Sequence, residues 1–326
     1  MKNIPGDIFI SIACYRDPEV VPTIRDAYNK AKFKSNIIFG IYAQMGNDPD
    51  EKLDVSFINP NQMRLLVKSY LKARGPSYAR YIIYNKLYKG ELFYLQIDSH
   101  TRFTENWDES LVEMLMGLPE NSVISTYPRG YNIDSDYLSD SKMMNVMNLK
   151  KIRNGVPIFS SKPESLVFPK KNYFWAAGYS FCYGAIFSVV PFDPNLKNLF
   201  WGEEFIMSLR FFTHGINIFT PHRHLIYTLW SRNHRHTFWE LKNIIGPKFS
   251  VYGFMSFLRL CEIGKLCDTA IFKDKVSADL EKYGVGYKKS IDTFYNLTGL
   301  DELIKKENFS KVISNNYFTL KKELEG

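Results

Sequence analysis

Apolar runs alternate with helical patterns through the first half of the chain. Short runs rich in β-branched and aromatic residues predict strands, at residues 7–14, 36–43, 64–68, 92–97 and 122–126. Helices are expected between them, over residues 17–32, 75–90 and 106–116. The run LFYLQI is apolar at almost every position, which is typical of a strand buried on both faces of its sheet. This order predicts an α/β fold with a mainly parallel sheet.

The pattern is less regular beyond residue 130. Residues 130–171 are polar and carry lysine pairs, so they are expected to form a loop. One helix and several short strands should follow, the helix at 203–214 and the strands around 173–177, 182–189, 216–219 and 224–229. From about residue 236 helical patterns dominate, and their apolar positions need a surface to cover. We expect an α/β body at 1–235 and, packed on it, a helical extension at 236–326.

Composition narrows the class of protein. Of the 326 residues, 45% are hydrophobic and 23% charged, values that exclude wholesale disorder. The four cysteines form no C-x-x-C motif, so neither a zinc ribbon nor a disulfide scaffold is expected. No apolar run is long enough to span a bilayer, and the N-terminus is typical of a first strand, not of a signal peptide. These features predict a soluble, cytoplasmic protein without a transmembrane segment.

Charge and aromatic content leave alternatives open. The net charge of +8 suits nucleic acid, an anionic membrane or a phosphorylated ligand, and equally a solvated basic surface. The aromatic content of 16% fits an aromatic core, or a pocket whose rings stack on a sugar or a base. The sequence contains neither a dinucleotide fingerprint nor a P-loop. It also lacks an aromatic-basic groove and a helical reader motif, so nucleic acid is not an expected partner.

The segment Gln96–His100 follows the strand with the most buried pattern. In open α/β sheets, ligands bind beyond the carboxyl ends of the strands. Asp98 and His100 are two residues apart, so in extended backbone they point to the same side. A carboxylate and an imidazole together suit a divalent cation, Mn2+ or Mg2+, which would neutralise charge on a diphosphate leaving group. The alternative is a polar turn that binds nothing.

Three other segments carry candidate chemistry. Residues 11–17 (SIACYRD) end the first strand, where a nucleotide would lie in such a fold. Arg74 and Arg80 flank a helix start and suit anionic phosphate, or form surface ion pairs. Glu203 and Glu204 begin a later helix. They either stabilise its N-terminus or position or deprotonate an acceptor hydroxyl.

In combination these segments resemble the polypeptide N-acetylglucosaminyltransferases, which modify hydroxyproline in a ubiquitin-ligase adaptor or Ser/Thr in mucin-like proteins. The matching segments run in family order from about residue 8 to residue 300 and read SIACYRDPE, ARGPSYAR, LQIDSHTRFTENWD, FWAAGYSFCYGAIF, VPFDPNLKNLFWGEEFIMSLRFFTHG and YGVGYKKSID. The resemblance implies a GT-A fold, a UDP-sugar donor, a divalent cation and retention of anomeric configuration.

The resemblance also implies roles for single residues. Asp98 and His100 correspond to a metal-binding pair, and Glu203 and Glu204 to a wall beside the acceptor. Contacts to the donor are implied for Ser11, Ala13, Tyr15, Arg16, Asp17, Arg74, Arg80, Ser99, Ala177 and Gly178. One departure is Thr228, which stands where the family usually has a third metal-binding histidine.

The sequence therefore predicts a metal-dependent glycosyltransferase that moves GlcNAc, or a related hexose, from UDP to a hydroxyl of a protein or a glycan. The alternative is a protein of the same fold that binds a nucleotide sugar without transferring it. Thr228 favours that alternative, whereas the intact Asp98, His100 and Glu204 oppose it.

Overall fold

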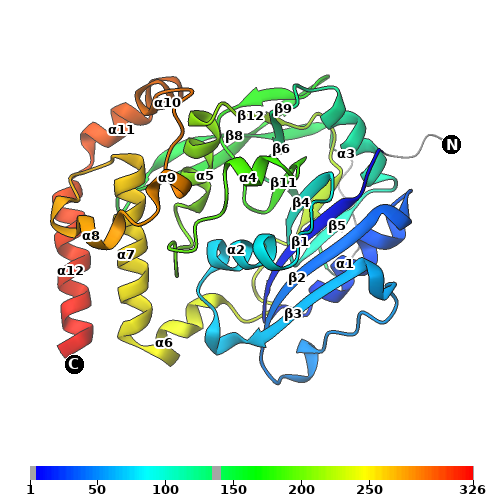
Figure 1. Ribbon diagram of the computed structural model, residues 1–326, viewed down its shortest axis with the longest axis horizontal. Helices are drawn as coiled ribbons and strands as arrows, with labels where there is room; N and C mark the ends of the chain where they lie inside the picture. Colours follow the sequence, from blue (N-terminus) through cyan, green and yellow to red (C-terminus); the bar gives the residue numbers. More distant parts are fainter. Residues whose placement is uncertain (1–4, 134–140, 326) are drawn as a thin grey trace.

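An eight-stranded sheet forms the centre of the body (Figure 1). The computed structural model describes residues 5–133 and 141–325. From one edge to the other, the strands are β10 (Lys170–Asn172), β12 (Asn217–Thr220), β6 (Ser122–Ser125), β11 (Tyr179–Tyr183), β4 (Phe93–Asp98), β1 (Ile8–Tyr15), β2 (Ile37–Met45) and β3 (Met63–Ser69). β4, β1, β2 and β3 are mutually parallel, and β12 is parallel to β6. β11 runs antiparallel between β4 and β6, and β10 is antiparallel to β12. The predicted, mainly parallel sheet is confirmed.

Helices cover both faces of this sheet. In β1, Ile10 packs in a cluster with α1 and α3, whereas its neighbour Phe9 packs in a cluster with α2, α4 and α5. Successive side chains of a strand point to opposite faces, so a strand that is apolar at every position needs cover on both sides. The bounds of these helices are α1 (Val20–Lys30), α2 (Pro76–Lys86), α3 (Trp107–Met116), α4 (Ile186–Val189) and α5 (Glu203–Thr213).

The expectation of a loop at 130–171 is wrong for most of that range. Two long antiparallel strands, β8 (Met143–Arg153) and β9 (Val156–Ser165), form a hairpin there. Asn154 and Gly155 join them, both with positive φ, of 51° and 75°. An Asn-Gly pair with these angles is the favoured two-residue hairpin connection, so the sequence carried the signal. The stretch 134–140 of the expected loop lies outside the described residues.

Two smaller expectations also need correction. The strand expected around 173–177 lies earlier, as β10, and the strand expected over 182–189 is β11 followed by the short helix α4. A second sheet, of three strands, stands beside the carboxyl end of β4. Its strands are β5 (Thr101–Phe103), β13 (Ile226–Thr228) and β7 (Arg129–Gly130), in that order.

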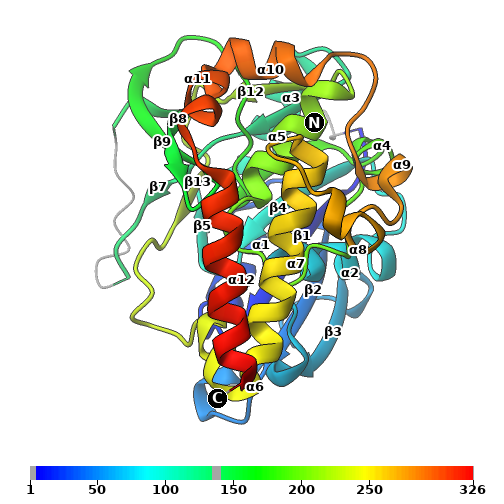
Figure 2. The same cartoon turned by 90° about the vertical axis from the view of Figure 1, so that its left-hand side faces the viewer.

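Helices make up the C-terminal region, and the two longest lie side by side (Figure 2). Leu258 and Phe294 of this region share one buried cluster with Phe159 of β9 and Leu209 of α5. The body and the C-terminal helices are therefore joined by common core. The helices are α6 (Leu241–Ile245), α7 (Pro247–Gly264), α8 (Lys273–Val276), α9 (Leu280–Tyr283), α10 (Ile291–Thr298), α11 (Leu300–Lys306) and α12 (Phe309–Glu325). Among the described residues, no helix is both long enough and apolar enough to cross a membrane.

Candidate functional site

A cavity of about 550 Å³ opens at the carboxyl ends of β1, β2 and β4. This is the edge of an open α/β sheet at which ligands bind, and the volume is that of a small-molecule site. The N-terminal ends of α2 and α5 reach the same cavity. Its remaining walls come from β9 and from the segment that follows β13.

Most of the residues predicted from the sequence line this cavity, namely Ala13, Tyr15, Arg80, Asp98, Ser99, His100, Ala177, Gly178, Glu203 and Glu204. Ser11, Arg16, Asp17 and Arg74 are not part of the lining. Ser11 is fully buried within β1, and Arg74 donates to the carbonyl oxygen of Ala73. The roles expected of all fourteen residues stay predictions, and for these four the cavity lining gives no support.

Arg16 is engaged in a cluster of carboxylates. The chain leaves β1 with a φ of 45° at this residue. The guanidinium forms ion pairs with Asp48, with Glu51 at 2.7 Å and with Glu240 at 2.9 Å. Glu240 also accepts a hydrogen bond from the Tyr15 hydroxyl at 2.7 Å. The cluster ties the segment after β2 and the segment before α6 to the end of β1.

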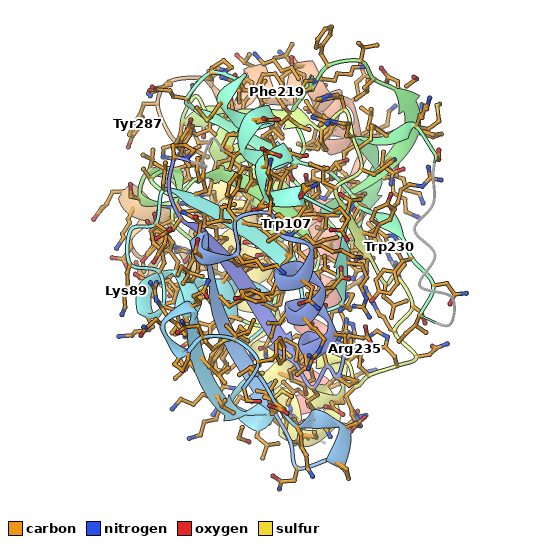
Figure 3. The ribbon with its side chains drawn as sticks, turned by 90° about the vertical axis from the view of Figure 1, so that its right-hand side faces the viewer. Lys89, Trp107, Phe219, Trp230, Arg235 and Tyr287 are labelled. Carbon is orange, nitrogen blue, oxygen red and sulfur yellow. The ribbon has the colours of Figure 1, made fainter. Side chains whose placement is uncertain are left out.

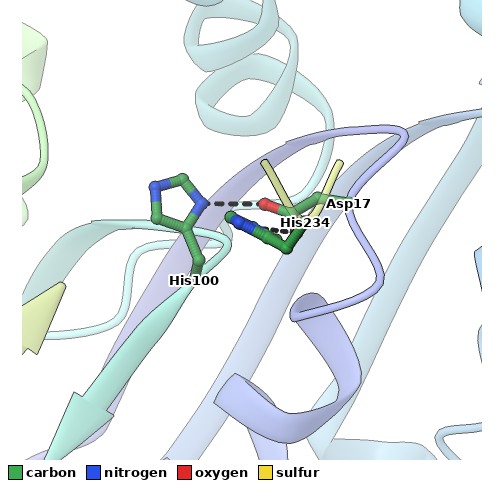
Figure 4. Close-up of side chains that lie close together, drawn as sticks. All are labelled: Asp17, His100 and His234. Carbon is green, nitrogen blue, oxygen red and sulfur yellow. Dashed lines mark hydrogen bonds and ion pairs between the residues drawn. The ribbon is translucent and has the colours of Figure 1, made fainter. Parts of the chain in front are cut away.

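Asp17 lies fully buried between two imidazoles (Figure 4). Its Oδ2 lies 2.8 Å from Nδ1 of His100 and accepts the Ser99 hydroxyl at 2.6 Å. His234 Nε2 lies 3.3 Å from its Oδ1. Burial alone would raise the pKa of Asp17, but the hydrogen bonds from His100 and His234 hold that pKa well below its ordinary value. Asp17 is therefore ionised and can only accept, so Nδ1 of His100 donates to it.

The other nitrogen of His100 faces Asp98. Its Nε2 lies 4.0 Å from Oδ2 of Asp98. One cation at roughly 2.1 Å from each atom can bridge that gap. Gly178 keeps the carboxylate accessible, because a Cβ added there would lie 2.7 Å from the same Oδ2. Arg80 Nη2 lies 3.6 Å from Oδ1 and helps to fix the carboxylate. The two side chains predicted from the sequence as a metal-binding pair thus lie side by side at the cavity.

Asp17, His100 and His234 form a second group whose ligand atoms all lie within 4.8 Å of one another. Arg235 argues against a cation there, because its Nε lies 3.4 Å from Oδ2 of Asp17 and supplies positive charge already. A third group, of Asp48, Glu51 and His236, is likewise neutralised by Arg16. The carboxylate of Asp98 also has an arginine beside it, Arg80, but Arg80 is already paired with Glu203. Of the three groups, the Asp98–His100 pair is the one whose members all line the cavity.

The two glutamates at the start of α5 have different partners. Glu203 forms a buried ion pair with Arg80, with 2.5 Å between Oε2 and Nη1. Glu204 accepts the Tyr127 hydroxyl at 2.6 Å and the Ala177 N–H at 3.0 Å. Burial raises the pKa of Glu204 to about 7, against the lowering effect of these two hydrogen bonds. Only Glu204 therefore presents a carboxylate without a charged partner to the cavity.

Thr228 lines the cavity at the end of β13, but its hydroxyl donates to the carbonyl oxygen of His100 at 3.4 Å. His234 is the histidine nearest to His100, with 5.6 Å between the ring centroids. Thr228 thus supports the backbone of the segment Asp98–His100. The second imidazole, that of His234, lies on the loop after β13.

Sequence reasoning missed part of the cavity wall. Some of these residues lie on segments that had been given no role, and they include Gln44, Tyr127, Pro157, Ile158, Phe159, Ser160, Ser161, Trp230, Arg232, Arg235 and Phe238. Gln44, at the end of β2, could have been found by the strand-end argument that identified Asp98. The β9 residues could not, because the hairpin itself was not expected.

The chain is similar to known glycosyltransferases. A family model described as Glycosyltransferase (GlcNAc) matches residues 47–304. No curated protein sequence matches the chain. Among solved structures, GalNAc-T7 with UDP, GalNAc and Mn2+ superposes with a TM-score of 0.62 at 11% identity, over 92% of this chain and 58% of that chain. The chain thus spans little more than half of the length of GalNAc-T7.

Two further structures are more distant. The mannosyltransferase PcManGT from Pyrobaculum calidifontis, in complex with GDP-Man and Mn2+, covers 84% of this chain and 69% of its own at 9% identity, with a TM-score of 0.49. S. aureus TarS 1–349, in complex with UDP-GlcNAc, covers 98% and 91% at 12% identity, with a TM-score of 0.46. At such identities a structural likeness speaks to the fold alone. The likeness to GalNAc-T7 confirms the predicted GT-A-type fold.

Proposed function

The chain belongs to the glycosyltransferase (GlcNAc) family, and from this premise we propose that it transfers GlcNAc, or a related hexose, from a UDP-sugar to a hydroxyl acceptor with the help of a divalent cation. The observation that carries the proposal is the Asp98–His100 pair. It lies at the carboxyl end of β4 and lines the cavity, with 4.0 Å between Nε2 of His100 and Oδ2 of Asp98, a gap that one cation could bridge.

Asp98 and Nε2 of His100 would hold the cation. When bound, a divalent cation supplies positive charge that neutralises the diphosphate leaving group. Asp17 supports this role, because its bond to Nδ1 fixes the tautomer in which Nε2 has a free lone pair. Arg80, held between Glu203 and Asp98, orients the carboxylate.

The donor would lie along the strand ends. Ala13, Tyr15 and Gln44 line the part of the cavity at the ends of β1 and β2, which suits the nucleoside. Ala177 and Gly178 lie beside Asp98 and would border the transferred sugar. The backbone at Gly178 approaches the Asp98 carboxylate closely, since a Cβ added there would lie 2.7 Å from Oδ2.

Glu204 would act on the acceptor. Each of its carboxylate oxygens already accepts one hydrogen bond, from Tyr127 or from Ala177, and keeps a second lone pair. An acceptor hydroxyl can donate to that lone pair and is then held close to the anomeric carbon of the donor. The resemblance to retaining enzymes suits this positioning role.

Mass spectrometry of reaction products tests the proposal. The purified chain is incubated with a panel of UDP- and GDP-sugars and with hydroxyl acceptors, with Mn2+ or with EDTA. With Mn2+ we expect an acceptor to gain the mass of the transferred sugar residue, together with release of UDP. With EDTA we expect neither. Full turnover in EDTA would contradict the cation's role. Tight calorimetric binding of UDP-GlcNAc without any turnover would instead support the binding protein that Thr228 allows.

A further inference from the structure

The exposed tryptophans of the chain gather at one place. Of its five tryptophans, Trp107 and Trp175 are fully buried in the core. Trp201, Trp230 and Trp239 are 46%, 57% and 37% exposed. Trp201 and Trp230 line the cavity, and Trp239 packs against a ring that does. Exposed apolar rings collected around a single opening indicate a binding surface, whereas scattered ones do not.

Trp230 packs against Tyr127, which links it to Glu204. It meets the Tyr127 ring edge-on, at 5.9 Å and 89°, and the Tyr127 hydroxyl donates to Glu204. Its Cδ1 would lie 3.0 Å from a Cβ added at Gly130, so a larger residue there would displace the indole. Figure 3 shows Trp230 on the outer loop at the right-hand edge of the molecule.

A second group of rings lies at the start of α5, the helix that carries Glu204. Phe200 contacts Trp201 at 5.2 Å and Trp239 at 5.3 Å between ring centroids. The guanidinium of Arg232 lies 5.2 Å from the Phe200 centroid. Trp201 precedes Glu203 by two residues, at the start of α5. Both groups of rings therefore contribute to the lining of the cavity into which Glu204 also faces.

Hydrogen-bonding groups complete the same wall. Ser160 and Ser161 of β9 line the cavity, as does Arg232. Exposed indole rings next to hydroxyl and guanidinium groups match a ligand with one flat C–H face and a rim of hydroxyls. A pyranose ring has this form. A proline-rich peptide can also dock on an aromatic-lined groove, so peptides that contain hydroxyproline are the decisive comparison in the test below.

We propose that Trp230, Trp201 and their neighbouring rings form an acceptor subsite for a sugar, so that the acceptor is a glycan. The inference rests on the proposed function and adds the acceptor class to it. The acceptor ring stacks on an indole and directs one hydroxyl to Glu204. That oxygen bonds to the anomeric carbon of the donor as the bond to UDP breaks, and the hydroxyl proton leaves with the UDP phosphate.

The experiment compares Trp230→Ala and Trp201→Ala with Tyr287→Ala. Tyr287 is a matched control, because it is 96% exposed and labelled at the opposite side of Figure 3, away from Trp230. Transfer is measured to methyl glycosides of glucose, galactose, mannose and GlcNAc, and to peptides containing hydroxyproline, serine or threonine. Donor hydrolysis without an acceptor and the affinity for UDP are measured for each variant.

We expect transfer to at least one glycoside in preference to every peptide. Trp230→Ala should raise the KM for that glycoside about fivefold or more, the loss expected for a truncated stacking partner. The affinity for UDP should change less than the KM for the glycoside does, and Tyr287→Ala should behave as the unaltered protein. Preferred transfer to a peptide, or an unchanged acceptor KM in both tryptophan variants, would overturn the inference.

Tryptophan fluorescence separates this inference from the proposed function. The same glycosides are titrated into the protein with UDP and Mn2+ present. Saturable quenching that is lost in Trp230→Ala supports the sugar subsite even if no donor is turned over, in which case the proposed function fails alone. Donor turnover without glycoside binding or glycoside transfer would overturn the subsite and leave the proposed function standing.

Discussion

The floor and the rim of the cavity are built in different ways. The floor consists of side chains at the ends of parallel strands, and Asp98, His100 and the buried Asp17 hold one another in place there. The rim consists of exposed rings such as Trp201 and Trp230, which come from segments far apart in the chain. The floor is rigid and suits chemistry, because its groups are paired before any ligand arrives.

The rim is suited to selection of a partner. Its rings contact few charged groups, and it is assembled by the loop after β13, the start of α5 and the hairpin strand β9. Loops on a rigid scaffold vary most easily in sequence and carry specificity. Changes in the floor should therefore abolish turnover with any acceptor, whereas changes in the rim should alter which acceptor is used.

Removal of the Asp98 charge should have the largest effect. Asp98→Asn keeps the size of the side chain but loses the charge that would hold the cation, so turnover should fall roughly 10³-fold or more with every acceptor. The melting temperature should stay close to that of the unaltered protein, since Asp98 is partly exposed. Steady-state UDP release checks this, with Asp50→Asn as an exposed control. If Asp98→Asn released UDP as fast as the unaltered protein, the floor residues would have no role in the reaction.

Glu204→Gln should reduce transfer by roughly 10²-fold, within the range seen for a positioned carboxylate. UDP affinity should hardly change, because the residue faces the acceptor side. Since burial raises the pKa of Glu204 to about 7, its charged form grows as the pH rises through that value. The kcat of the unaltered protein should therefore increase from pH 6 to pH 8. The Gln variant should lack this rise; an identical rise in both proteins would assign it to another group.

Asp17→Asn distinguishes the two candidate cation sites that share His100, namely Asp98–His100 and Asp17–His100–His234. If Asp98 and Nε2 of His100 hold the cation, Asp17→Asn removes only the support of the ring and should weaken Mn2+ binding roughly 10–100-fold. Calorimetry of Mn2+ in the presence of UDP measures this, with His224→Ala as a control histidine outside the cavity. If Asp17→Asn abolishes binding while Asp98→Asn leaves it intact, the cation belongs to Asp17, His100 and His234.

The sequence predicted the floor better than the rim for a physical reason. Asp98 and His100 follow a strand whose apolar run fixes both its burial and its place in the sheet, so local pattern determines where they lie. Arg16 and Asp17 also follow a strand, but a positive φ at Arg16 turns both away from the cavity. Strand periodicity carries no information on such a turn.

The rim depends on contacts between distant segments. Trp230 stands beside Tyr127 because β13 and β7 are neighbours in the small sheet, a pairing that no local pattern indicates. The hairpin that supplies β9 has a local turn signal, Asn154–Gly155, but its strands are polar and were therefore expected to be loop. Tertiary pairing of this kind overrides local propensity.

Thr228→His should have the smallest effect, and it acts where floor and rim meet. Thr228 is buried at the end of β13, beside the His100 backbone, at the position that the sequence resemblance assigns to a third metal ligand. A histidine there should tighten Mn2+ binding in the absence of UDP by a few-fold, since a neutral third ligand adds modestly to a carboxylate and an imidazole. Calorimetry of the variant and of His234→Ala checks this. No gain in Thr228→His together with a large loss in His234→Ala would place the third ligand on the loop after β13. In that case the rim segment would contribute to the chemistry of the floor, and the separation between the two regions would no longer hold.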